Sequence, residues 1–223
     1  MINDLLCGVD RVKATRLAGQ WYGDTKHPSG KSVFSLYSTL AAMVVEELAL
    51  AKPQMRPDAF KAYDPPSCWH AALLLGTFLY TPTNFDTLCR AASLQVAELV
   101  AVLTPDKRLA GPRQRLLYHA AVRSFTPQAK LLCLLHVRQQ AQLFTTLLSA
   151  DLVPSPTLLE EANTFREDAQ VLVSECRTVQ TELPLPLPEL ATRCVADLKR
   201  LAAAIKQKGV NNGQQEQQRK NVG

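Results

Sequence analysis

The chain has 223 residues, of which 47% are apolar and 20% charged, so it can bury a substantial core and is not disordered over most of its length. Its 25 basic and 20 acidic residues give a formal net charge of +5. Four basic residues and a single acidic one lie in the Gln- and Asn-rich tail 206–223, so the charge of the remaining body is too small to indicate nucleic-acid binding.

The pattern along the chain predicts helices almost throughout, because the alternating Val/Ile/Thr runs that are typical of strands are absent. Ser, Thr or Asn residues in capping positions, in several cases followed by proline, mark where helices begin. The predicted helices are 3 to about 20, 33–51, a short one within the Pro-rich break 53–66, 68–80 (capped by Ser67), 85–92, 94–103, one that begins after Thr104-Pro105, 127–150, and 156 to about 179.

The C-terminal part is predicted to contain a strap, a helix and a tail. Alternating prolines in LPLPLP at 183–188 favour an extended strap between helices, or a Pro-rich ligand for a partner domain. The last helix has one apolar stripe at helical spacing, made of Leu190, Cys194, Leu198, Leu201 and Ile205. We therefore expect a domain over 1–150, helices over 151–208 packed on it, and a disordered tail over 209–223.

The cysteines and the lengths of the apolar runs indicate the cellular compartment in which the protein is expected. No pair of cysteines has Cys-x-x-Cys spacing and no signal peptide precedes them, which predicts reduced, buried thiols in a cytoplasmic protein. An organellar location stays open, because a processed form would have lost its leader. The longest apolar runs, 40–45 and 71–75, are far shorter than the ~20 residues of a membrane span, so no membrane association is expected.

One stretch, 72–142, has an order of residues that can be compared with a known family. Its pieces are ALLLGT at 72–77, YT at 80–81, QV at 95–96, LV at 99–100, LTPDK at 103–107, QR at 114–115 and PQAKLL at 127–132. Without a gap from Ala72 to His136, this order resembles the HD-domain (p)ppGpp hydrolases of the RelA/SpoT type, above all the small single-domain Mesh-type alarmone hydrolases. With a weaker likeness around Ser29-Gly30, the resemblance covers about 14–150. It implies an all-α, HD-domain-like helical bundle with additional C-terminal helices.

The resemblance also implies a metal-dependent reaction in the family. Its members hold one manganese ion with a His, a His-Asp pair and a later Asp, assisted by a Glu-Asp pair, and the metal activates a water that attacks the 3′-pyrophosphate.

The matching positions of this chain are degenerate. They are Leu36, or a neighbour within one residue, for the first His; Leu75 and Gly76 for the His-Asp pair; Leu79 and Tyr80 for the Glu-Asp pair; and His136 for the last Asp. Leucine and glycine side chains have no lone pair, and a single imidazole holds manganese poorly. The resemblance therefore implies that the manganese site is lost and that no cofactor is bound.

Three residues are candidates for binding a nucleotide. Lys26 and His27 lie where the family has a basic residue facing the nucleotide, and Gln140 matches an asparagine of the family. A P-loop and a Gly-x-Ser-x-Gly motif are both absent, so neither an ATPase nor a serine hydrolase is expected.

The favoured hypothesis is a catalytically inactive pseudo-hydrolase that acts by binding, either within a protein assembly or as a homo-oligomer. Apolar residues in place of the ligands agree with this, because clustered carboxylates repel one another without a metal. Two alternatives remain: a sensor that binds a guanine nucleotide or alarmone without cleaving it, and a residual hydrolase with a relocated metal site. Nucleic acid is considered as a partner only for the basic tail.

Overall fold

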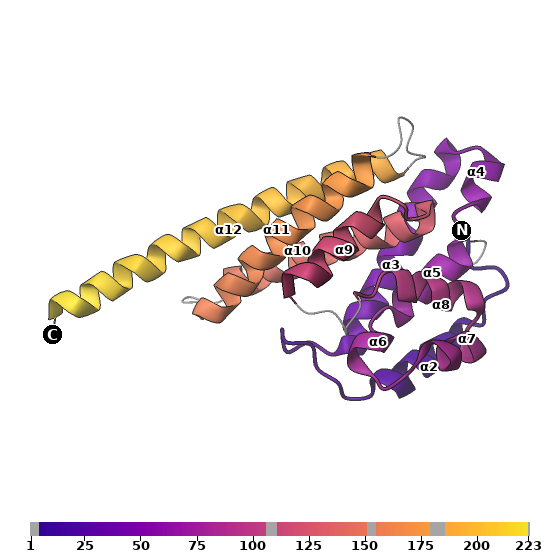
Figure 1. Ribbon diagram of the computed structural model, residues 1–223, viewed down its shortest axis with the longest axis horizontal. Helices are drawn as coiled ribbons and strands as arrows, with labels where there is room; N and C mark the ends of the chain where they lie inside the picture. Colours follow the sequence, from indigo (N-terminus) through magenta and orange to yellow (C-terminus); the bar gives the residue numbers. More distant parts are fainter. Residues whose placement is uncertain (1–4, 106–110, 151–154, 179–185, 223) are drawn as a thin grey trace.

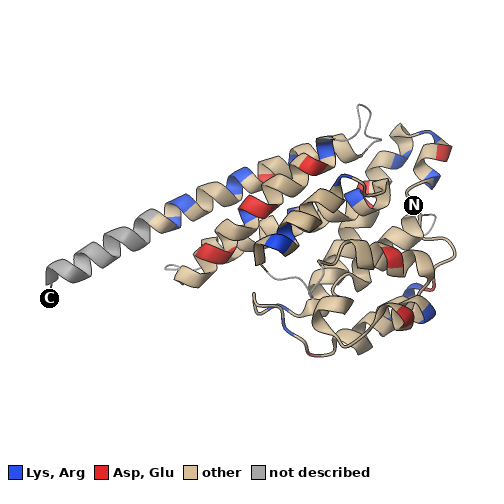
Figure 2. Cartoon of the chain, viewed as in Figure 1, with Lys and Arg blue, Asp and Glu red and all other residues tan. Residues whose placement is uncertain are grey.

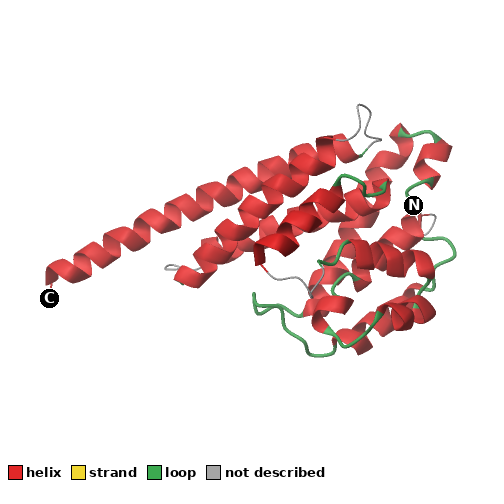
Figure 3. Cartoon of the chain, viewed as in Figure 1, coloured by secondary structure: helices red, strands yellow, loops and turns green. Residues whose placement is uncertain are grey.

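The computed structural model describes residues 5–105, 111–150, 155–178 and 186–222 of the chain. These residues are mostly helical and contain no strand (Figure 3); one isolated β-bridge joins Lys26 to Ser32. The all-α fold class predicted from the sequence is confirmed for this part of the chain. Its elements are α2 (Arg11–Tyr22), α3 (Val33–Ala51), the 3₁₀ turn η1 (Lys52–Gln54), α4 (Pro57–Lys61), α5 (Pro65–Leu74), α6 (Thr77–Tyr80), α7 (Phe85–Ala91), α8 (Leu94–Val102), α9 (Gly111–Val122), α10 (Pro127–Ala150), α11 (Pro156–Thr178) and α12 (Leu187–Val222).

The helices form two connected groups (Figure 1). α10, α11 and α12 run side by side along the long axis with α9 against α11, whereas α2 and α5 to α8 gather at one end around α3. α3 packs against both α5 and α10 and so joins the groups. One cluster of buried apolar side chains extends from Leu5 to Leu201 through both, and the division of the chain at residue 150 stays a prediction.

Several helix boundaries agree with those predicted from capping residues. The bounds of α3 and α10 are as expected. Asn84, Ser93 and Thr126 each accept a hydrogen bond, at 2.9 to 3.3 Å, from the backbone N–H three residues further on. These side chains satisfy donors that the first turn of a helix leaves unpaired, which is why they mark the starts of α7, α8 and α10.

The predicted helix over 3 to about 20 is interrupted: Leu5 is helical, and a turn at 6–8 separates it from α2. The expected cap Asn3 lies outside the described residues, and α2 starts at Arg11. Gly8 has a φ of +87°, a left-handed conformation that interrupts a helix, and Asp10 accepts a hydrogen bond of 2.9 Å from the backbone N–H of Lys13. Asp10 is therefore the cap of α2.

The predicted helix over 68–80 is wrong in two respects. It begins earlier, at Pro65, because Asp64 rather than Ser67 is its cap. It is also interrupted, because α5 ends at Leu74 and the short α6 starts only at Thr77. This interruption lies at the positions that match the family's His-Asp pair.

The C-terminal expectations are met in part. Residues 183–185 of the predicted strap lie outside the described residues, and so do residues 106–110, which follow Thr104-Pro105. α12 begins at Leu187, and proline is tolerated in a first helical turn because its missing N–H has no partner there. α12 continues to Val222, through the stretch that the sequence predicts to be a disordered tail, and the disorder of 209–223 stays a prediction.

Two further expectations concern α3 and the cysteines. The stretch Val33–Gln54 is long and apolar enough to cross a membrane by length and composition. In the fold, however, half of its most apolar window is buried against other helices, as expected of a core helix. All six cysteines are free thiols and four of them are buried as predicted, whereas Cys89 is only half-buried and Cys7 is exposed, because it lies in the turn before α2.

Ion pairs fix the C-terminal helices to the rest of the molecule. Figure 2 shows basic residues on α9 and acidic residues on α11, and Arg123 donates two hydrogen bonds to Glu175 between these helices. On α12, Asp197 is only 4% exposed and accepts hydrogen bonds from Arg138 at 3.0 Å and Gln142 at 3.1 Å on α10. The position of α12 thus depends on a buried carboxylate.

Substituting Asp197→Ala is expected to lower the free energy of unfolding by about 3 kcal/mol, because it leaves the half-buried Arg138 without its counter-charge. Asp58→Ala is the control, since the Arg56–Asp58 pair is exposed, and should cost less than ~0.5 kcal/mol. Urea unfolding of both variants measures the difference. Equal losses would show that the Asp197 cluster does not stabilise the packing of α12.

Candidate functional site

The hydroxyl of Tyr22 organises the break between α5 and α6. It accepts a hydrogen bond of 3.1 Å from the backbone N–H of Gly76 and donates one of 3.1 Å to the backbone oxygen of Leu73. Thr77 lies 3.5 Å away through its Oγ1. Tyr22 is buried, and desolvation raises the pKa of its phenol, which stays protonated. The backbone groups exposed by the break are thus satisfied inside the core.

Tyr37 of α3 fills the space beside Gly76. A Cβ atom placed on Gly76 would lie 2.8 Å from Cζ and 2.9 Å from Cδ2 of Tyr37, and closer still to Cε2. Real Cβ atoms essentially never approach so closely, so a side chain at position 76 would require the buried ring of Tyr37 to shift. An aspartate, the residue that the family has there, does not fit in this packing.

Tyr37 is the centre of a cluster of aromatic rings. Its ring stacks on Tyr22 with centroids 5.7 Å apart, and lies 6.4 Å from the ring of Tyr80 and 6.2 Å from that of His136. The ring of His27 lies 6.2 Å from that of Tyr80. We call these five residues the aromatic cluster; it brings together side chains from α2, the following loop, α3, α6 and α10.

The six degenerate positions do not all lie at this cluster. Gly76, Tyr80 and His136 do. Leu36 and Leu75 are buried, and the backbone oxygen of Leu36 accepts a hydrogen bond of 2.6 Å from Nε2 of Gln139. Leu79 is 39% exposed. Tyr37, within the one-residue margin that the alignment allowed around Leu36, is the α3 residue whose side chain reaches the cluster.

His136 is held as a neutral imidazole. Its Nε2 lies 3.4 Å from the amide nitrogen of Gln140, one turn further along α10. Burial, and to a smaller extent the proximity of His27, lowers the pKa of His136 from its ordinary value to about 4. Among the described residues, no three His, Cys, Asp or Glu side chains are grouped so that they could hold a metal ion.

The loop between α2 and α3 presents His27. Its Nδ1 accepts a hydrogen bond of 3.1 Å from the backbone N–H of Ser29, so in the neutral ring the proton is on Nε2. Burial lowers the pKa of His27, and the carboxylate of Glu161 on α11 opposes that shift only in part. His27 is therefore an uncharged donor near neutral pH.

A cavity of about 220 Å³ lies between this loop, α10 and the start of α11. His27 and Gln140 both line it, so the structure brings two of the three nucleotide-binding candidates together. Lys26 is exposed and does not line the cavity. Glu161 does line the cavity, and no sequence signal pointed to it, because α11 lies outside the stretch that resembles the family.

Comparisons with known proteins support the fold. No protein-family model and no curated protein sequence matches the chain. The chain is similar to a solved structure with a TM-score of 0.58 and 16% sequence identity. That structure is described as a metazoan ortholog of SpoT that hydrolyzes ppGpp and plays a role in starvation responses. The match covers 82% of this chain and 93% of that one. At this identity the likeness concerns the fold, which is the all-α HD-domain-like fold that the resemblance implies.

Substituting Gly76→Ala tests the contact with Tyr37. Gly76 has a φ of −77°, which alanine adopts freely, so any cost comes from the clash. We expect a loss of at least ~2 kcal/mol in the free energy of unfolding. The loss should persist in a Tyr37→Phe background, which keeps the ring, and largely vanish in a Tyr37→Ala background. Urea unfolding of the double-mutant cycle measures the coupling, and additive effects would contradict the packing described.

The titration of His136 is a second test. Because its folded pKa of about 4 lies below the ordinary value of 6.5, the unfolded state takes up the proton first as the pH falls. Stability contributed by His136 is therefore present above pH 6.5 and lost between pH 6.5 and 4. NMR titration of the imidazole should give a midpoint near pH 4, and the wild type should lose stability relative to His136→Gln over that range. A midpoint near 6.5 would contradict a buried imidazole.

Proposed function

We propose that this chain is a catalytically inactive relative of the (p)ppGpp 3′-pyrophosphohydrolases that acts by binding, as an interaction or assembly subunit. The observation that carries the proposal is the ring of Tyr37 in the space beside Gly76. A side chain at that position is what the family uses to hold its metal, and here none fits without displacing the core.

The residues around Gly76 do not fit the family's manganese ion. They offer the imidazole of His136 and the phenols of Tyr37 and Tyr80. Burial raises the pKa of both phenols, so they stay protonated and are poor ligands for a divalent cation. Manganese prefers several carboxylate or imidazole ligands, which supports the loss of the metal-dependent reaction.

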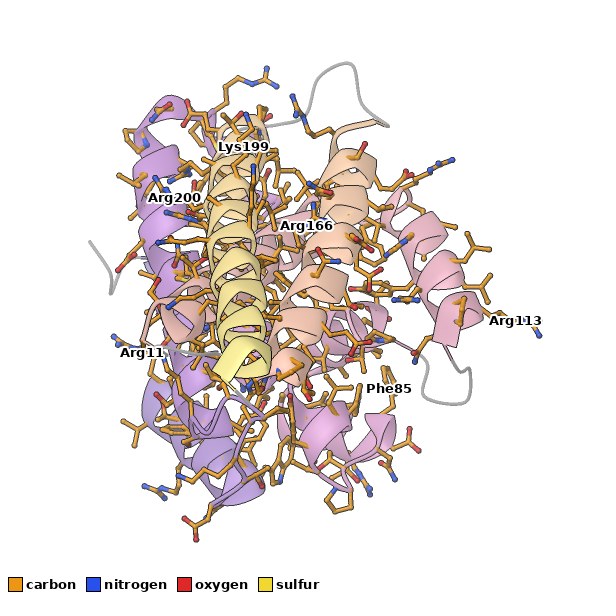
Figure 4. The ribbon with its side chains drawn as sticks, turned by 90° about the vertical axis from the view of Figure 1, so that its left-hand side faces the viewer. Arg11, Phe85, Arg113, Arg166, Lys199 and Arg200 are labelled. Carbon is orange, nitrogen blue, oxygen red and sulfur yellow. The ribbon has the colours of Figure 1, made fainter. Side chains whose placement is uncertain are left out.

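Exposed apolar side chains on α8 and on α9 support the binding role. Leu94 and Val102 on α8 are 55% and 42% exposed, and Leu116 and Leu117 on α9 are 69% and 49% exposed. A groove of about 320 Å³ runs between α8 and the junction of α9 with α10. Figure 4 shows Arg113 of α9 projecting away from the bundle. Exposed apolar patches beside grooves are typical of protein interaction sites.

The alternative of a nucleotide sensor has weaker support. His27 and Gln140 line a common cavity, as such a site would need. That cavity contains the carboxylate of Glu161, however, and no cationic side chain among the described residues that line it, so it does not favour phosphate groups.

The hydrolase assay is the decisive test. We expect no release of pyrophosphate from ppGpp above the blank in the presence of manganese, because no metal-bound water would be activated. Turnover that His136→Ala abolishes would overturn the proposal in favour of a residual enzyme. Calorimetry with ppGpp and GTP is the parallel measurement: binding that is lost in Lys26→Ala or His27→Ala would favour the sensor.

The binding role predicts an assembly in solution. The endogenous protein should elute from size exclusion with light scattering at a mass above that of one 223-residue chain, as a homo-oligomer or a defined complex. Leu116→Asp and Leu117→Asp should reduce that mass, because they place charge on the apolar surface of α9. Leu79→Asp, at another exposed leucine, is the control. A monomer under all conditions would count against the proposal.

A further inference from the structure

The cavity beside His27 is lined by one acidic side chain and by no lysine or arginine among the described residues. Among the described residues that line it, Glu161 has the only charged side chain near neutral pH, because the lowered pKa of His27 keeps that ring neutral. His136, which contacts Gln140 from the side of the aromatic cluster, is neutral for the same reason. The described lining therefore carries one negative charge and no positive one.

The cavity also has a fixed hydrogen-bond acceptor. Gln140 is only 9% exposed, and its amide nitrogen faces His136 at 3.4 Å. The amide oxygen of Gln140 then remains available as an acceptor. Together with Glu161, the lining offers acceptors from two helices, α10 and α11, on which a donor-rich group can be held.

Apart from Pro28 and Ser29 of the loop, whose Ser29 hydroxyl is hydrogen-bonded to Nδ1 of His27 at 2.9 Å, the rest of the described lining is apolar. α10 contributes Leu143, Phe144 and Leu147, and α11 contributes Leu158. The ring of Phe144 packs against that of Phe165 with centroids 5.3 Å apart, which restrains its orientation. An aromatic ring in an apolar wall favours both a hydrophobic body and a cation near its face.

We propose that this cavity is a binding site for a small organic cation, an ammonium or guanidinium group carried on an apolar aliphatic or aromatic body. The cationic head pairs with Glu161 and donates to Gln140, while the body packs on Leu143, Phe144 and Leu158. A volume of about 220 Å³ corresponds to roughly seven water molecules at ~30 Å³ each, which suits a ligand of that size. The site does not depend on whether the chain hydrolyses ppGpp.

Three probes that share a phenylethyl body and differ in the charge of the head group test the charge preference of the cavity by calorimetry at pH 7.5. Phenethylamine is the cation, 2-phenylethanol the neutral analogue and 3-phenylpropionate the anion. We expect phenethylamine to bind about tenfold more tightly than the alcohol, as a hydrogen bond to a charged group predicts, and the anion to bind least. The anion binding as well as the cation, or no probe binding at millimolar concentration, would overturn the proposal.

The chain offers a matched control beside the carboxylate. Glu161→Gln should abolish the preference for phenethylamine over 2-phenylethanol, whereas Glu160→Gln, at the exposed neighbour that does not line the cavity, should keep it. Both residues are exposed, so neither variant should unfold the protein.

The His27 imidazole resonance locates the ligand. It should shift on addition of phenethylamine to wild type and to Glu160→Gln, and much less with Glu161→Gln. A preference that survives in Glu161→Gln, or an unmoved His27 resonance in the wild type, would place the binding elsewhere and contradict the site.

Discussion

The contact between the ring of Tyr37 and the backbone at Gly76 constrains the centre of the molecule. Only glycine leaves room for that ring, and the interruption of the helix at this point exposes backbone groups that the buried hydroxyl of Tyr22 satisfies. Three features are thus parts of one arrangement: the glycine at position 76, the break between α5 and α6, and the stacking of Tyr22 on Tyr37. Changing any of them alone leaves either a clash or an unpaired polar group in the core.

This arrangement explains how a fold that resembles metal-dependent hydrolases is stable with aromatic rings at its centre. In the family the same region concentrates carboxylates, which repel one another unless a cation is bound. Here protonated phenols and a neutral imidazole occupy it, and burial itself keeps them uncharged by raising the pKa of Tyr37 and lowering that of His136. The centre therefore needs no counter-ion, and the polar groups that remain lie at its edge, where Gln140 borders the cavity.

Helices whose first turn is capped by a side chain were predicted correctly from the sequence. Helix boundaries that depend on contacts between distant parts of the chain were not. The caps Asn84, Ser93 and Thr126 each bond to a backbone N–H only three residues away, so the starts of α7, α8 and α10 could be predicted from the local sequence. The break after Leu74 was missed, because Gly76 is the only local signal in 71–80 and the hydroxyl that satisfies the broken backbone belongs to Tyr22, more than fifty residues away. The choice between Leu36 and Tyr37 likewise depends on the rotation of α3 within the core, which no local pattern encodes.

The C-terminal helices determine the chemistry of the cavity as well as completing the core. α11 is held against α9 by the pairing of Arg123 with Glu175 and of Arg115 with Asp168, at 3.6 Å. Because a helix is rigid over this length, fixing those two acidic residues also fixes Glu161 at the start of α11 beside the loop of His27. A cavity that in isolation would be neutral thereby acquires a negative charge. α11 lies outside the stretch that resembles the family. Its Glu161 makes the cavity unfavourable for anions.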